Sequence, residues 1–188
     1  MKTDLLRVEK TYLAHLLEAI QRCVYFLDAA TQKIVWPLQG ESLQAHKKDI
    51  ALFDALSVLN ERFAKLQDTL ATALRHALLL LGEQHDSFLK VLAYYQKHEV
   101  IDSIEDWQLL RTTHNLAAHD YEIDYADIAE HFNNLHDLLG TLYLTSQRFV
   151  DHCQSTLGIV PHSADFSEEF FKAVAQGATS HQLGDHDE

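Results

Sequence analysis

Apolar residues recur at steps of three and four along most of this chain, which is the spacing that gathers side chains on one face of an α-helix. Few residues interrupt the pattern, because only 6 Gly and 2 Pro occur among the 188 residues. We therefore predict helices over residues 4–29, 48–81, 87–97, 104–119 and 125–153. The segment that contains Pro37 and Gly40 is predicted to be irregular.

The same spacing predicts which face of each helix is buried. In the helix over 104–119, Leu109 and Leu116 are seven residues apart and are predicted to point inward. The stripe predicted for the first helix consists of Leu5, Val8, Tyr12, Leu16, Ile20 and Cys23. The stripe predicted for the second helix consists of Leu52, Leu56, Leu59, Phe63, Leu66 and Leu70.

Several helix ends are also marked in the sequence. Thr3 suits the N-cap of the first helix, and Gly82 suits a stop after the second. Ser103 and Asp106 have the spacing of a capping box before the fourth. Amphipathic helices joined by short loops predict an all-α, up-and-down bundle of four to five helices. We assign the bundle to residues 1–153 and regard 154–188 as a C-terminal appendage, with a short docked helix over 166–175 and a disordered end from 177.

Composition favours a single domain with a sizeable core, since 47% of the residues are hydrophobic. The formal net charge is −13, from 15 Lys and Arg against 28 Asp and Glu, so bulk nucleic acid is repelled. Binding to RNA would need a local basic patch or a basic partner.

Cys23 and Cys153 do not make a disulfide framework and are predicted to be core thiols. With no apolar segment long enough to cross a bilayer, we predict a soluble, cytoplasmic protein.

The chemistry-bearing residues concentrate near the end of the helix over 104–119. Arg111, Asn115 and His119 are four residues apart and share one helix face, while His114 and Tyr121 share a neighbouring face. Imidazoles can move protons at a ribose hydroxyl or a leaving oxygen, and a guanidinium stabilises phosphate charge. The set therefore suits metal-independent cleavage of a phosphodiester. The alternative is that His114 and His119 are solvated or capping residues near a helix end.

The stretch His114–Tyr121 resembles the signature of the HEPN superfamily, which reads Arg-Asn, a short spacer, His, any residue, Tyr. Over residues 88–121 the chain resembles the HepT-like proteins, which accompany a minimal nucleotidyltransferase. The shared features are a Phe-Leu helix, a turn near 100–102 and an acidic pair before Trp107. The likeness covers about residues 4–153 and is strongest from Phe88 to Asn133.

That resemblance implies a HEPN-like fold, a toxin–antitoxin pair with the nucleotidyltransferase, a homodimer and an RNA substrate. It implies that His119 acts as acid or base and that Asn115 orients the site. His114 or Arg111 would contact phosphate, and Tyr121 would accept adenylate from the partner. The implied cleavage leaves a 2′,3′-cyclic phosphate and a 5′-hydroxyl.

One residue departs from the family pattern, because His114 stands where the signature has Arg. A planar guanidinium fork is not fully replaced by imidazole. Two functions therefore stay open: an endoribonuclease weakened by this change, or a non-catalytic subunit that binds the nucleotidyltransferase. A structural helical protein without a site is a third. Arg111 could reach the phosphate if two protomers oppose their helices over 104–119.

Other constellations give weaker signals. No two of the 13 His are three or four residues apart, and no Glu precedes a His by three residues, so we expect no metal site and no cofactor. Tyr94 and Tyr95 are expected to be core and rim residues rather than a base-stacking platform.

Overall fold

The computed structural model describes residues 2–83, 86–117 and 124–184, and the side chains of residues 4–83, 86–113 and 124–177. Regular structure in these residues is entirely α-helical, which confirms the predicted all-α class. The eight helices are α1 (Lys2–Thr31), α2 (Gly40–Ala45), α3 (Ile50–Leu80), α4 (Phe88–Lys97), α5 (Ile104–Ala117), α6 (Tyr125–Asp137), α7 (Leu139–Leu157) and α8 (Ser167–Gly184).

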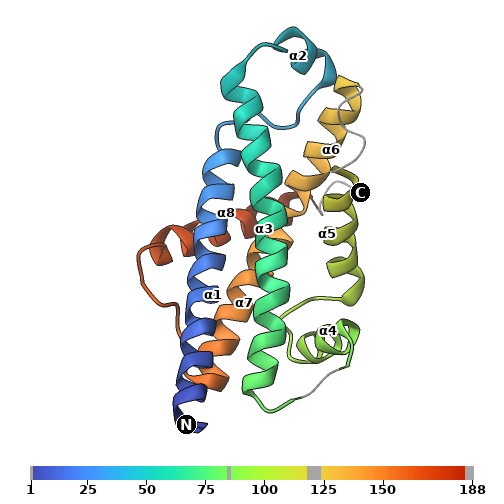
Figure 1. Cartoon of the computed structure of the whole chain (residues 1–188). Helices are drawn as coiled ribbons and strands as arrows, with labels where there is room; N and C mark the ends of the chain where they lie inside the picture. Colours follow the sequence, from blue (N-terminus) through green and yellow to red (C-terminus); the bar gives the residue numbers. More distant parts are fainter. Residues whose placement is uncertain (1, 84–85, 118–123, 185–188) are drawn as a thin grey trace.

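Two long helices, α1 and α3, form the centre of the molecule and lie side by side over most of their length (Figure 1). Helix α7 packs on both of them, and α8 crosses α1 and α7 on one side. On the other side α4, α5 and α6 line the flank of α3, and α2 lies at one end of the bundle against α6. One continuous apolar core runs through this arrangement, and its largest fully buried side chains are Tyr95, Phe63, Phe149 and Phe170.

Helix α3 follows its predicted pattern closely. Leu56, Leu59, Phe63, Leu66 and Leu70 are all buried, and only Leu52 at the first turn is partly exposed. The helix ends where predicted, because Gly82 adopts a left-handed φ of 82° that allows the chain to turn back. The amide N–H of Glu83 then donates to the carbonyl of Leu78 at 3.1 Å, which completes the helix cap.

The stripe predicted for α1 is wrong over its first three turns. Leu5, Val8 and Tyr12 are 61, 56 and 47% exposed. A second stripe at three- and four-residue steps is the buried one: Leu13, Leu17, Ile20, Val24 and Leu27. Both stripes have helical periodicity and share Ile20, so the choice depends on where α3 and α7 lie. Thr3 lies inside α1 and is not its N-cap.

Two other predictions of helix boundaries are wrong. The helix predicted over 125–153 is two helices, α6 and α7, which meet at Leu138. Apolar spacing continues across the junction through the buried Leu135, Leu139 and Leu142, so periodicity could not reveal the break. The segment after Pro37 is not entirely irregular, because it contains α2, and the helices outnumber the four to five predicted.

Contacts distant in sequence account for the position of α2. The side-chain amide of Asn133 on α6 accepts from the N–H of Leu38 at 2.8 Å and donates to its carbonyl at 3.0 Å. Gly40 begins α2 so close to α6 that an added Cβ would lie 2.8 Å from the backbone of Ala126. Neither contact is visible in local sequence patterns.

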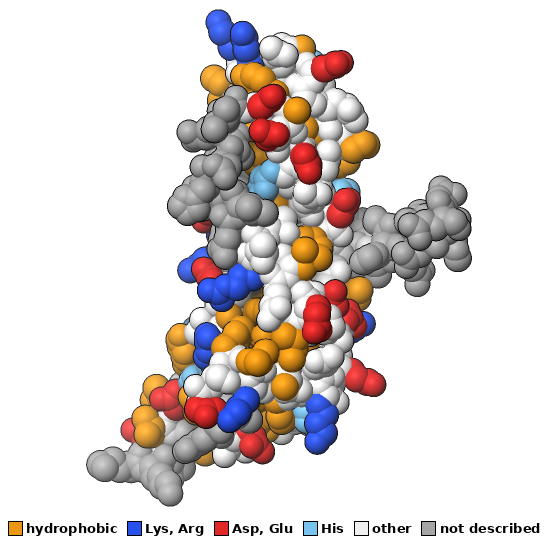
Figure 2. Space-filling model, turned by 90° about the vertical axis from the view of Figure 1, so that its right-hand side faces the viewer, with side chains coloured by type: hydrophobic (Ala, Val, Ile, Leu, Met, Phe, Trp, Pro, Cys, Tyr) orange, Lys and Arg blue, Asp and Glu red, His pale blue; other side chains and the backbone are white. Residues whose placement is uncertain are grey.

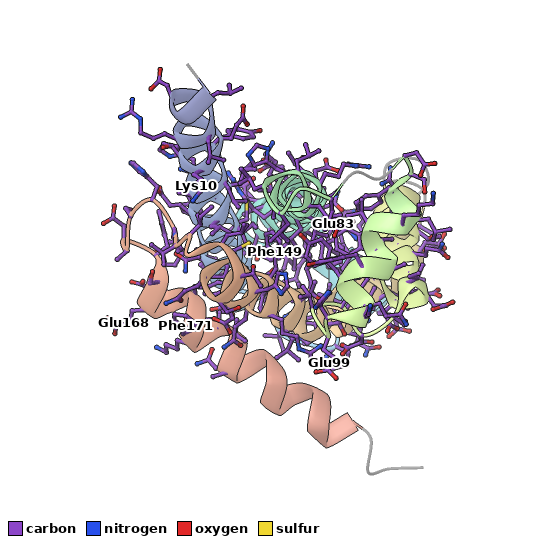
Figure 3. All side chains as sticks on the ribbon, turned by 90° about the horizontal axis from the view of Figure 1, so that it is seen from below. Lys10, Glu83, Glu99, Phe149, Glu168 and Phe171 are labelled. Carbon is purple, nitrogen blue, oxygen red and sulfur yellow. The ribbon has the colours of Figure 1, made fainter. Side chains whose placement is uncertain are left out.

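The C-terminal segment extends the same core. Phe170, Ala173 and Val174 of α8 are buried with the residues of the other helices, whereas Phe171 on the outer side is 44% exposed (Figure 3). Gly177 approaches α7 closely, because a Cβ there would lie 3.3 Å from the Tyr143 ring. Helix α8 continues to Gly184, so the predicted disorder from 177 does not hold that far, and residues 185–188 lie outside the described part of the chain.

Candidate functional site

Helix α5 carries the first part of the predicted site, and its start is well defined. As the sequence predicts, Ser103 and Asp106 form a reciprocal cap: the Asp106 N–H donates to Ser103 Oγ at 2.9 Å, and that hydroxyl donates to the Asp106 carboxylate. Just before the cap, Val100 and Ile101 are buried, and an ion pair joins Asp102 to Arg148 of α7. The base of α5 is therefore held by the rest of the bundle.

The inner face of α5 differs from the predicted one. Trp107, Leu110 and Thr113 are 4, 2 and 8% exposed and point toward the core at three-residue steps. Trp107 packs edge-on against Phe88 of α4, with ring centroids 5.8 Å apart. The prediction for Leu109 is wrong, since it is 52% exposed. The helix presents Trp107 to the core because that larger ring fills the space beside α4.

Arg111 lies on the outward side of α5. Its side chain is exposed and forms no ion pair or hydrogen bond with any side chain that the structure describes. The backbone of α5 continues through positions 114 and 115, so position 115 stands one turn beyond Arg111 on the same side. The side chains of His114, Asn115 and Leu116 lie outside the described ones.

His119 and Tyr121 also lie outside the described residues, in the segment 118–123. The helices on both sides of that segment are described and pack against each other. After it, Asp124 caps α6, since its carboxylate accepts from the Ala126 N–H at 2.9 Å. The structure therefore places Arg111 on α5. It also describes the helices before and after the segment that carries His119 and Tyr121. It does not locate those two side chains.

The electrostatic setting of this segment is acidic. Between residues 104 and 137 the sequence contains one Lys or Arg, which is Arg111, whereas Asp and Glu occur repeatedly. Asp124, Asp127 and Glu130 of α6 are exposed. Acidic side chains also extend over the upper part of this face, where α6 lies (Figure 2). A phosphate approaching Arg111 would meet this negative potential, and the basic patch that RNA binding calls for is not present on α5 or α6.

Both cysteines are buried and free, as predicted. Burial raises the pKa of Cys23, and it raises the pKa of Cys153 to about 12. Neither thiol is therefore ionised near neutral pH, and both act as apolar core groups. Tyr95 is fully buried and Tyr94 is partly exposed, so the pair consists of one core residue and one rim residue.

One polar cluster was missed in the sequence. Tyr94 and His98 of α4 meet His152 of α7, with the two His ring centroids 5.6 Å apart. The two His are 54 positions apart, so no local spacing could pair them.

Two hollows of about 410 and 320 Å³ lie beside α1 and between α3 and α4, respectively. No residue of α5 or α6 lines either hollow.

Among the described residues, no group of three or more His, Cys, Asp or Glu is arranged to hold a metal ion. Within the same part of the chain, none of the helices combines the length and the apolar character needed to cross a membrane. No family model, curated protein or solved structure matches the chain.

Proposed function

We propose that this chain is a HEPN-like, HepT-like partner of a minimal nucleotidyltransferase, and that residues 111–121 form a weakened, metal-independent endoribonuclease site. The observation that carries the proposal is the position of Arg111, the first residue of the polar motif. It lies on the exposed side of α5, whose opposite side is anchored by Trp107 and whose start is capped by Ser103. A helix that presents an unpaired guanidinium outward suits binding better than packing.

In the proposed reaction, His119 takes the proton from a ribose 2′-hydroxyl as its oxygen attacks the adjacent phosphorus. The bond from phosphorus to the 5′-oxygen then breaks, and that oxygen takes up a proton. The products are a 2′,3′-cyclic phosphate and a 5′-hydroxyl. Arg111 or His114 stabilises the charge that develops on phosphate, and Asn115 orients the reacting groups.

The direct experiment is cleavage of a labelled RNA by the purified protein in EDTA, compared with His119→Ala. The expected result is slow cleavage by the wild type that EDTA does not suppress and that the variant lacks. His46→Ala is the matched control, because His46 is exposed just after α2 and far along the chain from the motif. Equal cleavage by wild type and His119→Ala would show that the RNase activity belongs to another site or to a contaminant.

Tyr121 has a separate role in the proposal, as the acceptor of adenylate. Transfer of AMP from ATP to the phenolic oxygen releases pyrophosphate and places a phosphate beside the RNA site, where like charge repels the substrate phosphate. Incubation with ATP and a minimal nucleotidyltransferase that binds this protein, followed by peptide mass spectrometry, should locate AMP on Tyr121. Unchanged modification of Tyr121→Phe would remove this assignment.

A second candidate is a non-catalytic subunit that binds the nucleotidyltransferase, and a specific observation favours it. The outer side of α1 is apolar over Leu5, Val8 and Tyr12, and Leu79 of α3 is 63% exposed. The His76 ring, one turn before Leu79, packs edge-on against Tyr12. An apolar face of this kind is typical of a protein-binding surface.

This candidate predicts that Leu5→Ser with Val8→Ser weakens binding of the nucleotidyltransferase, measured by calorimetry with both purified proteins. Val35→Ser is the matched control, since Val35 is 86% exposed and lies in the segment before α2. Loss of binding without any RNA cleavage by the wild type would favour the second candidate over the first. Unchanged binding by the double variant would exclude this face.

A further inference from the structure

A cluster of rings holds α4 against α7. The ring of Tyr94 on α4 and that of His98, the residue that follows α4, are tilted by 37° to each other, with centroids 4.3 Å apart. His152 of α7 meets His98 at 5.6 Å and stands edge-on to Tyr95, also at 5.6 Å. Tyr95 in turn packs edge-on against Phe149, one turn before His152 on α7. The contact between these two helices is therefore made by aromatic rings, two of which can be protonated.

His152 has no group nearby that would stabilise a positive charge. Its side chain is partly buried, and its Nε2 has no hydrogen-bond partner in the described part of the chain. The neighbouring Tyr95 hydroxyl cannot serve, because it donates to the carbonyl of Leu74 at 3.0 Å. A protonated His152 would thus hold an unpaired donor and a charge beside a second imidazole, which is unfavourable in a partly buried setting.

Two of the charged groups around this cluster have other partners. Arg148, one turn before His152, forms an ion pair with Asp102. Burial, and after it the charge of Glu83, raise the pKa of Tyr94. Glu83 and Glu99, which flank α4 in the sequence, lie apart from each other (Figure 3). The groups that face His152 or adjoin it are Tyr94, Tyr95 and His98 from α4 and Asp151 and Cys153 from α7. Among the described residues, no carboxylate forms an ion pair with His152.

We propose that His98 and His152 form an acid-sensitive contact, which holds α4 on α7 while His152 is neutral and releases α4 when His152 takes up a proton. The consequence reaches beyond α4, because Phe88 of α4 supports Trp107 of α5. Release of α4 removes that support from the base of α5. Through this contact, the pH determines how firmly the base of α5, the helix that carries Arg111, is held. This proposal does not depend on what the motif on α5 does.

The direction of the effect follows from the pKa of His152. Burial, and to a smaller extent the nearby His98, lower its pKa from the usual value of 6.5. A His whose pKa is lower in the folded state contributes its full stability above 6.5 and loses it as the pH falls below that value. Asp151 acts in the opposite sense, because burial raises the pKa of its carboxyl and a raised carboxyl pKa favours the folded state in acid.

Amide hydrogen exchange of the full chain at pH 7.5 and 5.5 tests the proposal, after correction for the intrinsic exchange rate. We expect the opening rate of α4 amides to rise several-fold at the lower pH, because the lowered pKa of His152 makes the open state more favourable as this ring becomes protonated. Amides in the middle of α3 should not change, because no ring of the cluster belongs to that helix. An acid response that is equal in α4 and α3 would overturn the proposal, since it would reflect global unfolding.

Two variants distinguish the effect of this contact from a general sensitivity of the fold to acid. His152→Phe keeps a ring in place but cannot be protonated, so α4 opening should change less than about twofold between the two pH values. His98→Gln removes the second imidazole from an exposed position and should reduce the response, even if His152→Phe fails to fold. His46→Gln, just after α2, should respond like the wild type. A response in His98→Gln as large as that of the wild type would contradict the paired mechanism.

Discussion

Helices α3 and α5 are both amphipathic, but their surroundings differ. Apolar partners cover α3 from Ala55 to Leu78 on its buried side, and the side chains there fill a continuous core. In the part of α5 whose side chains the structure describes, Trp107, Leu110 and Thr113 are buried and Ile104 is partly buried, while Leu109 and Arg111 face solvent. Helix α3 therefore contributes more to the core than this part of α5 does. Substitutions in the two helices should therefore affect different properties.

The largest expected effect on stability is in α3. Phe63 is fully buried, so Phe63→Ala should lower the free energy of unfolding by about 3–5 kcal/mol, through lost apolar burial and the cavity left behind. Leu109→Ala on the exposed side of α5 should change it by no more than about 0.5 kcal/mol. Urea unfolding followed by circular dichroism measures both. Similar losses in the two variants would mean that the two helices do not differ as described.

A smaller effect is expected where α6 holds the segment before α2. Asn133→Ala removes both hydrogen bonds to the Leu38 backbone and leaves those groups partly buried without partners. The expected cost is about 1–3 kcal/mol in the free energy of unfolding. Asn134→Ala is the control, because Asn134 is exposed on the same helix. If the two variants unfold at the same urea concentration, the Asn133 contact does not stabilise the end of the bundle.

The smallest stability effect is expected at the start of α5. Ser103→Ala removes the hydroxyl that accepts from the Asp106 N–H, and it should cost about 1 kcal/mol. Ser103→Thr keeps a hydroxyl and should retain most of the stability. A loss in Ser103→Thr as large as that in Ser103→Ala would indicate that the cap is not the reason for the effect.

Local patterns predicted the parts of the fold that depend on neighbours in sequence. The α3 stripe, the Gly82 stop and the Ser103–Asp106 cap are of this kind. Contacts between distant segments could not be predicted from such patterns. The exposed side of α1 had the same periodicity as its buried side, and only the position of α3 and α7 distinguishes Tyr12 from Leu13.

At the candidate site too, predictions from local sequence spacing and contacts between distant segments had different outcomes. Sequence spacing placed Arg111 on a helix face, and the structure confirms that the side chain is exposed. The inward position of Leu109 was wrong because Trp107, which packs against Phe88, sets the rotation of α5. The His98–His152 cluster was not predicted at all, because its members lie on α4 and α7. The roles of His114, Asn115, His119 and Tyr121 stay predictions.

The central claim is that residues 111–121 form an endoribonuclease site weakened by His114, and His114→Arg tests it most directly. The substitution supplies a permanently charged fork of donors for phosphate in place of an imidazole. A charge-assisted contact of this kind contributes about 2–4 kcal/mol to a transition state, so RNA cleavage in EDTA should become at least about tenfold faster than in the wild type. Adding His119→Ala to the same variant should abolish the gain. A folded His114→Arg protein that cleaves RNA no faster than the wild type would contradict the claim.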